Sequence, residues 1–389
     1  MAKKILVIDD SALMRRVISD IIKQSEQYEV AEFAHDGLEG FDKIVSHSKY
    51  YDAVLLDINM PKLNGLELLE MLYKNKIQQK VIVVSTVAKQ GAKETIRALE
   101  LGALDFVTKP ENFIEAKGDE FKERIISALD MATSVNLNMS AVASNIPDNT
   151  QSKNTRLRTF STPVNSTVRP LGSSLNARTS ENKSVKVSEA SAYKREKANR
   201  IIALACSTGG PKSLQQVIPY IPAQIDAGIV IVQHMPAGFT QSLASRLNEI
   251  SKVKVKEAEE GEVVAKGVVY IAPGGRHMRL VKSGMDAKIA LSDEPPVEAL
   301  RPCANVMYES LKNTPYEEIV CVVMTGMGTD GTRGIKSLKA QKKVRVIGQD
   351  EATSIVYGMP RAVAEAGLVD EVKPLTEIAD AITRNTGVR

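Results

Sequence analysis

Residues 1–131 alternate between short apolar runs and longer segments in which apolar residues recur every third or fourth position. A short, uniformly apolar run is typical of a strand buried on both faces, and the longer spacing predicts an amphipathic helix. The pattern predicts strands at Lys4–Ile8, Glu29–Phe33, Ala53–Leu56, Lys80–Val84 and Asp105–Val107, and helices at Ala12–Lys23, Leu38–Ser46, Gly65–Lys74, Lys89–Glu100 and Phe113–Met131.

The same alternation returns in residues 199–389. Because strands and helices alternate in both segments, we predict an α/β fold class with two doubly wound parallel-sheet domains. The strands are predicted at Arg200–Ala205, Gly228–Val232, Val253–Lys256, Val268–Ala272, Lys288–Leu291, Ile319–Met324 and Arg345–Gly348, and the helices at Lys212–Ile218, Ala237–Glu249, Ala299–Leu311, Gly331–Ala340 and Pro360–Ala366.

Residues 132–198 have a different composition, in which Ser, Asn, Thr and Ala dominate and apolar residues follow no period. Such a segment buries too little apolar surface to offset the entropy lost on ordering it. We therefore predict a flexible linker at 132–198, between domains at 1–131 and 199–389. The chain carries a net charge of +4, and Asp148–Arg200 alone carries +7. These charges come with few aromatic residues and no period, so a solvated linker is a better interpretation than a nucleic-acid site.

The composition indicates a cytoplasmic protein. Apolar residues make up 43% of the chain, and no apolar run is long enough to span a bilayer. The run at Ile5–Ile8 is too short for a signal peptide, so we expect no membrane insertion. The three cysteines, Cys206, Cys303 and Cys321, lack the spacing of metal ligands, which is typical of a reducing compartment.

Polar residues collect directly after the predicted strands of the first domain. The carboxyl ends of parallel strands meet at one edge of a doubly wound sheet. Carboxylates crowded at such an edge repel one another unless a cation neutralises them, and oxygen ligands suit Mg²⁺. A lysine there can pair with a carboxylate or with a phosphoryl oxygen. The residues in these positions are Asp9, Asp10, Asp57, Ser85, Thr86 and Lys109.

Together with Met60-Pro61, Gly65 and Phe106–Pro110, these residues resemble the receiver domain of bacterial two-component response regulators, which has a flavodoxin-like fold. The resemblance implies that Asp57 accepts a phosphoryl group from a histidine kinase. It also implies an Mg²⁺ site, a lysine that contacts the phosphoryl group, a switch aromatic and a switch hydroxyl. By this resemblance, Asp9, Asp10 and Asp57 form the Mg²⁺ site with the backbone of Asn59. Lys109 is the lysine that contacts the phosphoryl group, and Phe106 is the switch aromatic. Ser85 is the switch hydroxyl, with Thr86 beside it as the alternative. The Lys109–Pro110 bond is a candidate cis peptide.

The stretch Ile201–Pro211 predicts a buried strand, a tight turn and the start of a helix. Gly209 and Gly210 permit the turn, and Pro211 suits the first turn of a helix. Ser207 stands at the carboxyl end of the strand, where open α/β sheets place their ligand sites. On this stretch alone, an ordinary turn with a small polar residue is the simpler interpretation.

Two further strand ends change that interpretation, because His234 follows Gly228–Val232 and Asp330 follows Ile319–Met324. A serine hydroxyl becomes a nucleophile when a base takes its proton and an acid orients that base. Glycines 326, 328 and 331 allow backbone amides to face an oxyanion. Cys206 is a second candidate nucleophile and His277 a second candidate base. We rank both lower, since Cys206 should point to the opposite side of the strand and pack as a small apolar group, and the loop of His277 has no adjoining nucleophile.

The motifs of this domain resemble the catalytic domain of chemotaxis protein-glutamate methylesterases, a Rossmann-like three-layer fold. They are Ala205–Pro211, Gln233–Pro236, Ile271–Gly275, Leu300–Pro302 and Met324–Gly331. The resemblance implies Ser207 as nucleophile, His234 as general base and acid, Asp330 as its orienter and the Met327 backbone N–H as oxyanion donor. It implies glutamate methyl esters and glutamine side chains of chemoreceptors as substrates, with no cofactor for hydrolysis. Cys303 departs from the family pattern, which usually has Ser after Arg-Pro.

The order of receiver, linker and esterase predicts an enzyme that is gated by phosphorylation and resets chemotactic sensitivity. The unphosphorylated receiver would cover the Ser207 cleft, and phosphorylation of Asp57 would loosen that contact. The expected partners are a histidine kinase and methylated chemoreceptors, without nucleic acid. A response regulator whose output is binding, and a phosphotransfer scaffold with an inactive esterase half, are the alternatives.

Overall fold

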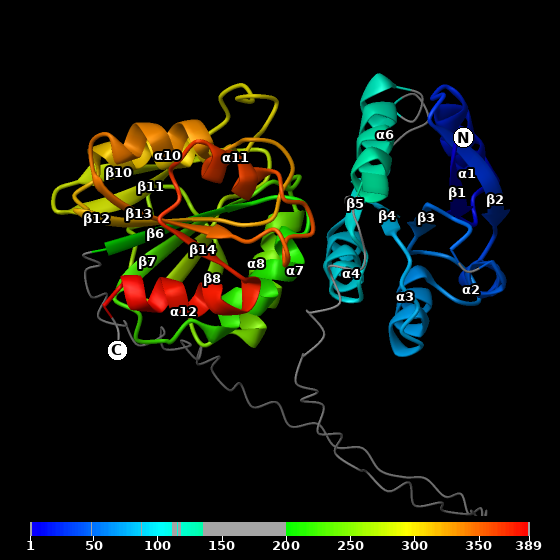
Figure 1. Cartoon of the computed structure of the whole chain (residues 1–389), viewed down its shortest axis with the longest axis horizontal. Coiled ribbons are helices and arrows are strands. Elements are labelled where there is room, and N and C mark those ends of the chain that lie inside the picture. The colour runs from blue at the N-terminus through cyan, green and yellow to red at the C-terminus, as the bar shows by residue number, and fades with distance from the viewer. Residues whose placement is uncertain are drawn as a thin grey trace, which may run out of the picture. The chain divides into compact units, whose positions relative to one another are not determined.

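The computed structural model in Figure 1 describes residues 2–47, 49–86, 88–110, 115, 118–134 and 200–387. The predicted linker lies outside the described residues from position 135 onward, and so does most of the basic segment on which a nucleic-acid function would depend. Residues 132–134, at the start of the segment assigned to the linker, extend the last receiver helix, α6 (Asp119–Ser134).

The first domain is built on five parallel strands in the order β2-β1-β3-β4-β5. Each strand begins and ends within one residue of its predicted range, and β3 and β4 are buried along their whole length. The strands are β1 (Lys3–Ile8), β2 (Tyr28–Ala34), β3 (Ala53–Asp57), β4 (Val81–Ser85) and β5 (Asp105–Thr108), and the helices besides α6 are α1 (Ala12–Lys23), α2 (Gly37–Ser46), α3 (Gly65–Lys74) and α4 (Lys89–Glu100).

Alternate residues of these strands pack into two apolar cores. On β1, Leu6 and Ile8 face the core that includes α2, α3 and α4, whereas Ile5 and Val7 face the core that includes α1 and α6. This alternation follows from the two-residue period of a strand, and it explains why the three central strands, β1, β3 and β4, are largely apolar. The predicted doubly wound sheet is confirmed.

The second domain contains seven parallel strands in the order β14-β13-β12-β6-β7-β9-β8. Helices α7, α8 and α12 cover one face, and α9, α10 and α11 lie on the other (Figure 1). The strands are β6 (Arg200–Cys206), β7 (Ala227–Gln233), β8 (Lys254–Glu257), β9 (Val268–Ile271), β12 (Glu318–Val323), β13 (Lys343–Gln349) and β14 (Glu371–Lys373). The helices are α7 (Gly210–Val217), α8 (Phe239–Ile250), α9 (Ala304–Ser310), α10 (Thr332–Lys339), α11 (Met359–Glu365) and α12 (Leu375–Asn385), with short 3₁₀ turns η2 (Ile218–Tyr220) and η3 (Leu311–Asn313).

Three features of this domain differ from the sequence prediction. The predicted strand at Lys288–Leu291 belongs to an antiparallel hairpin, β10 (His277–Ser283) with β11 (Asp286–Ser292), and not to the main sheet. The predicted helix at Ala299–Leu311 begins only at Ala304, because the preceding residues form a tight turn with positive φ at Glu298 and Ala299. The predictions also missed β14 and α12. Local periodicity does not distinguish a hairpin strand from a sheet strand.

The Lys109–Pro110 prediction was wrong, since among the described residues the only cis peptide bond is Arg301–Pro302. The trans form is the more stable one for most bonds before proline. The backbone N–H of Lys109 donates to Ser85 O at 2.7 Å, so the chain continues the pairing of β5 with β4 up to Lys109. Within the described ranges, no helix is both long enough and apolar enough to cross a bilayer.

Candidate active site and phosphorylation site

Three neighbouring strands of the second sheet end beside one another with polar residues. Ser207 directly follows β6, His234 directly follows β7, and Asp330 lies in the loop after β12. The pairings β12·β6 and β6·β7 are both parallel, so these ends lie at the same edge in the middle of the sheet. The structure therefore brings together the three residues that the motifs predicted, although their chemical roles remain predictions.

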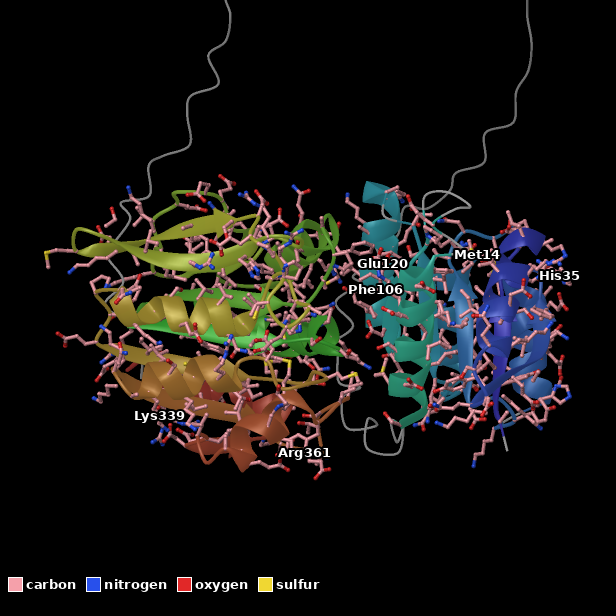
Figure 2. The ribbon with its side chains drawn as sticks, turned by 90° about the horizontal axis from the view of Figure 1, so that it is seen from above. Met14, His35, Phe106, Glu120, Lys339 and Arg361 are labelled. Atoms are coloured by element: carbon pink, nitrogen blue, oxygen red, sulfur yellow. The ribbon has the colours of Figure 1, made fainter. Side chains whose placement is uncertain are left out.

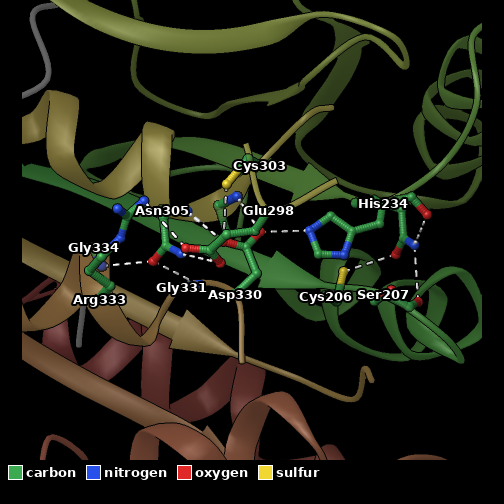
Figure 3. A network of polar contacts seen from close by, with 12 residues as sticks. Cys206, Ser207, His234, Glu298, Cys303, Asn305, Asp330, Gly331, Arg333 and Gly334 are labelled. Carbon is green, nitrogen blue, oxygen red and sulfur yellow. Dashed lines mark hydrogen bonds and ion pairs between the residues drawn. The ribbon is translucent and has the colours of Figure 1, made fainter. Parts of the chain in front are cut away.

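His234 and Asp330 are in direct contact (Figure 3), with Nε2 of the imidazole 2.8 Å from Oδ2 of the carboxylate. Asp330 is only 2% exposed. The backbone N–H groups of Ala304 and Asn305 donate to its two oxygens at 2.6 and 2.8 Å. Burial alone would raise the pKa of Asp330, but the hydrogen bond and charge of His234 and the two backbone amides hold it below its usual value. Asp330 is therefore built to stay ionised.

The bond from Nε2 to Asp330 leaves Nδ1 as the imidazole nitrogen for proton transfer. In Figure 3 that nitrogen lies on the side of the ring toward Cys206 and Ser207. The backbone holds the two strand ends together, because the N–H of His234 donates to Cys206 O at 3.2 Å and the N–H of Ser207 donates to Thr325 O at 3.0 Å. A neutral His234 that donates from Nε2 has its lone pair on Nδ1, ready for a proton.

The glycine-rich loop after β12 packs directly against Ser207. A Cβ on Gly326 would lie 2.8 Å from the Cβ of Ser207, so only glycine permits this approach. Gly328 has a φ of +86°, which favours glycine for its conformation as well. Met327 lies between the two, with a side chain that is 54% exposed. Its position next to the nucleophile fits the predicted role of its backbone N–H toward an oxyanion.

Gln233 is a site residue that the motif contained but to which the sequence analysis gave no role. Its side-chain amide donates to Ser207 O at 3.0 Å and to His234 O at 3.1 Å, and it is buried. A Cβ on Gly210 would lie 2.0 Å from Gln233 Oε1, so the first residue of α7 must also be glycine. The sequence signal was its position directly before His234, but its contacts depend on the neighbouring strand.

The rival residues do not occupy the site. Cys206 is fully buried in the core that includes α7, α8 and α12, as predicted for a small packed group, and its thiol donates to Gln233 Oε1 at 3.0 Å. Burial raises the pKa of Cys206 well above its usual value, so the thiol stays protonated. His277 is buried on β10, with Nε2 3.1 Å from Pro295 O. His35 is exposed and pairs with Glu39 (Figure 2).

In the first domain, Asp9, Asp10 and Asp57 form a cluster in which one carboxylate oxygen of each lies within 4.8 Å of the others. Asp9 and Asp57 are buried, and Asp10 is exposed. Three carboxylates at this spacing, one of them open to solvent, match the oxygen ligands and retained waters that Mg²⁺ prefers. The residues present therefore fit the predicted cation.

Lys109 bridges two of these acids, with Nζ 2.9 Å from Asp9 Oδ2 and 2.7 Å from Asp57 Oδ2. Burial raises the pKa of Asp57 above its usual value, although the charge of Lys109 opposes that rise. Burial would lower the pKa of Lys109, but the charges of Asp57 and Asp9 outweigh it and raise the pKa. The lysine therefore stays cationic, next to the predicted phosphoryl acceptor.

The remaining residues of the predicted phosphorylation site lie around Asp57. The backbone N–H of Asn59 donates weakly to Asp57 Oδ1, at 3.4 Å. The hydroxyl of Ser85 is buried and donates to Gly91 O at 3.4 Å, whereas Thr86 is exposed. Neither hydroxyl is assigned as the switch by these contacts, so both remain candidates.

Side chains of the receiver also contact the loop and helix next to Ser207. The ring of Phe106, labelled in Figure 2, stacks on Phe239 with centroids 4.6 Å apart. The hydroxyl of Thr208 donates to Asp105 Oδ2 at 2.9 Å. Ser207 and His234 line a small cavity of about 60 Å³ together with Asp105 and Phe106. Roughly two water molecules fill such a volume.

The fold and these two sites define a class of protein, a parallel α/β hydrolase joined to a receiver domain. Residues 202–382 match the model of the CheB methylesterase family, and residues 5–117 match that of the response regulator receiver domain. The chain is 38% identical to protein-glutamate methylesterase/protein-glutamine glutaminase 1 of Syntrophomonas wolfei over 98% of each chain. It is 37% identical to the protein-glutamate methylesterase/protein-glutamine glutaminase of Bacillus subtilis, over 98% of this chain and 97% of that one.

Among solved structures, the CheB methylesterase catalytic domain of Thermotoga maritima is 40% identical and covers 47% of this chain and 97% of its own, with a TM-score of 0.46. The likeness to the curated relatives extends over almost the whole chain. The chain therefore belongs to the protein-glutamate methylesterase/protein-glutamine glutaminase family, as the motifs in both domains predicted.

Proposed function

We propose that this chain is a phosphorylation-activated protein-glutamate methylesterase. It removes methyl groups from glutamate esters of chemoreceptors in the cytoplasm, converts glutamines at such sites to glutamates, and so resets chemotactic sensitivity. The observation that carries the proposal is the bonded pair of His234 and the buried Asp330 beside Ser207, at three neighbouring strand ends. Family membership supports the substrate class.

The hydrolysis uses only protein groups and water. Ser207 Oγ attacks the ester carbonyl while His234 Nδ1 takes its proton, and Asp330 stabilises the resulting imidazolium. The oxyanion of the tetrahedral intermediate accepts a hydrogen bond from the Met327 N–H. His234 returns the proton to the methoxide oxygen, which leaves as methanol, or to the amide nitrogen of a glutamine substrate, which leaves as ammonia. Water activated by His234 then hydrolyses the glutamyl ester on Ser207 and frees the enzyme.

The receiver supplies the regulation. Asp57 accepts a phosphoryl group from a histidine kinase. Asp9, Asp10 and Asp57, with the Asn59 carbonyl, would hold Mg²⁺, which would neutralise the negative charge of these crowded oxygens. Lys109 keeps its charge beside Asp57 and pairs with a phosphoryl oxygen. Phe106 lies on β5, three residues before Lys109, and its ring stacks on Phe239. This contact can transmit a change at the phosphorylation site to the catalytic domain.

The unphosphorylated receiver restricts access to Ser207. The cavity of about 60 Å³ beside Ser207 is far smaller than a glutamyl methyl ester on a receptor helix. Asp105 and Phe106 line that cavity, so the receiver must move before substrate enters. Loosening the contacts of Phe106 and Asp105 shifts the population toward an open state, by an amount set by the contact free energy that is lost.

Methanol release from methylated receptors, with and without a small phosphodonor, tests this function. Wild type should release methanol and accelerate with the phosphodonor. Ser207→Ala should lose hydrolysis by at least about a thousandfold while still accepting phosphate on Asp57. Asp57→Asn is the matched control, since it should keep slow hydrolysis and lose only the acceleration. Hydrolysis that persists in Ser207→Ala would overturn the nucleophile, and equal rates with and without phosphodonor would overturn the gating.

A further inference from the structure

We propose that Cys303 is a positioning residue for the catalytic acid, and that its thiol sets the proton affinity of the His234–Asp330 pair. The inference rests on the proposed function of that pair as base and acid. Cys303 lies in the turn that precedes α9, directly before two residues whose backbone amides also bind Asp330. Its side chain points at the same carboxylate (Figure 3).

The thiol completes the set of hydrogen-bond donors around Asp330. Cys303 Sγ lies 3.2 Å from Asp330 Oδ1, which also accepts from the N–H of Asn305. Oδ2 accepts from His234 and from the N–H of Ala304. Each carboxylate oxygen therefore has two donors, and Cys303 supplies the weakest of the four, because sulfur is a poor donor.

The thiol must remain protonated to act in this way. Burial and the charge of Asp330 raise the pKa of Cys303 to about 12, so the S–H is retained at neutral pH. Cys303 is 0% exposed, so its thiol does not lie at the solvent-accessible surface. A donor to the carboxylate stabilises the ionised acid and lowers its affinity for the shared proton. Loss of the thiol should therefore make Asp330 more basic and strengthen its hold on the proton that it shares with His234.

Other charged and titratable groups lie near Asp330 and stay the same in the test. Tyr308 on α9 is buried, and its hydroxyl donates to Val322 O at 2.9 Å. Glu298 accepts from the Asn305 side chain and lies 3.5 Å from Arg333 on α10. Asn305 also accepts from the N–H groups of Gly331 and Gly334, which holds the loop around Asp330. The backbone scaffold around the acid is thus independent of the Cys303 thiol.

The pH profile of kcat/KM separates this role from a purely structural one. The measurement uses the full phosphorylated chain and methylated receptor. In Cys303→Ala we expect the ascending limb, which reports the base, to move up by about half a pH unit, with KM and the high-pH plateau nearly unchanged. In Cys303→Ser, whose hydroxyl is a stronger donor, the limb should return to the wild-type position or below it. Cys321→Ala is the matched control, since Cys321 is an equally buried thiol on β12.

A second readout does not depend on activity. The infrared S–H stretching band that disappears in Cys303→Ser belongs to Cys303, and it should move to higher frequency in Asp330→Asn, where the carboxylate charge is lost. A lower plateau with an unmoved limb in Cys303→Ala, or an unmoved S–H band, would overturn the inference. Hydrolysis that persists in Ser207→Ala would overturn the proposed mechanism instead. The infrared result would remain valid in that case, because it reports only the contact between the Cys303 thiol and Asp330.

Discussion

The two sites of this chain occupy the same place in two parallel sheets but have opposite electrostatics. In the receiver, three carboxylates lie together and Lys109 reaches only two of them, so the cluster still demands a cation or another charged ligand. In the catalytic domain, a single carboxylate, Asp330, already has donors for both oxygens. The comparison teaches that the sheet edge supplies position, whereas the number of donors decides between ligand binding and proton transfer.

Replacing Asp330, whose two carboxylate oxygens already have hydrogen-bond donors, should have the largest effect on the rate of hydrolysis. Asp330→Asn removes the charge that stabilises the His234 imidazolium, and we expect kcat for methyl ester hydrolysis to fall by about 10³–10⁴. Phosphorylation of Asp57 should be unchanged, since that site lies in the other sheet. A loss of less than tenfold would mean that the His234–Asp330 bond is structural only.

Replacing Lys109, the cationic side chain of the receiver site, tests the other half of the comparison. Lys109→Ala leaves Asp9 and Asp57 without their bridging ammonium, so a phosphoryl group on Asp57 loses a charge-assisted partner. We expect the stimulation by a phosphodonor to fall at least about tenfold, while hydrolysis without phosphodonor stays within twofold of wild type, roughly. Lys62→Ala, which breaks the pair between an exposed lysine and the buried Asp36 in the same domain, is the control and should keep the stimulation.

Weakening the contact between the two domains should have a smaller effect on the rate of hydrolysis. Arg246 on α8 pairs with Glu100 on α4, with Nε 2.6 Å from Oε1. Because the pair is partly exposed, Arg246→Ala should loosen the contact by about 1 kcal/mol and raise the unphosphorylated rate about fivefold. Arg345→Ala breaks a pair with Glu371 inside the catalytic domain and serves as control. An unchanged rate in Arg246→Ala would show that this pair does not restrain the receiver.

The smallest expected effect is a pH dependence of stability. Burial raises the pKa of Asp105 to about 6, although the Phe106 N–H and the Thr208 hydroxyl donate to it and oppose the rise. The native chain therefore holds this proton where the unfolded chain has lost it, and ionised Asp105 destabilises the fold more as pH rises from about 4 to about 6. Asp105→Asn should gain stability over wild type through that window and then level off. Because Asp105 keeps partial exposure to solvent, we expect a gain of about 1 kcal/mol, below the roughly 3 kcal/mol that a shift of two pKa units gives at full strength. Denaturant unfolding at a series of pH values measures the difference, and a difference that is flat with pH would contradict it.

Much of the fold could be predicted from the local pattern, because strands that are buried on both faces form continuous apolar runs in the sequence. The five strands of the receiver sheet lie within one residue of their predicted ranges. The pairing of the hairpin β10·β11 could not be predicted, since the local pattern of a strand does not say which other strand it pairs with. The site residues Ser207, His234 and Asp330 were found from motifs at strand ends. Gln233, which donates to the carbonyls of Ser207 and His234, had no local signal that separated it from a core residue.

The sequence by itself determined the period of each element, the acids and the lysine that end the receiver strands, and the glycines Gly209 and Gly210 of the turn after Ser207. Those features depend on residues close together in the chain. Only the tertiary structure decided that β12 lies beside β6, and that the thiol of Cys303 reaches Asp330 across 27 positions. Strand order and such contacts depend on how all helices and strands pack at once, which no local period encodes.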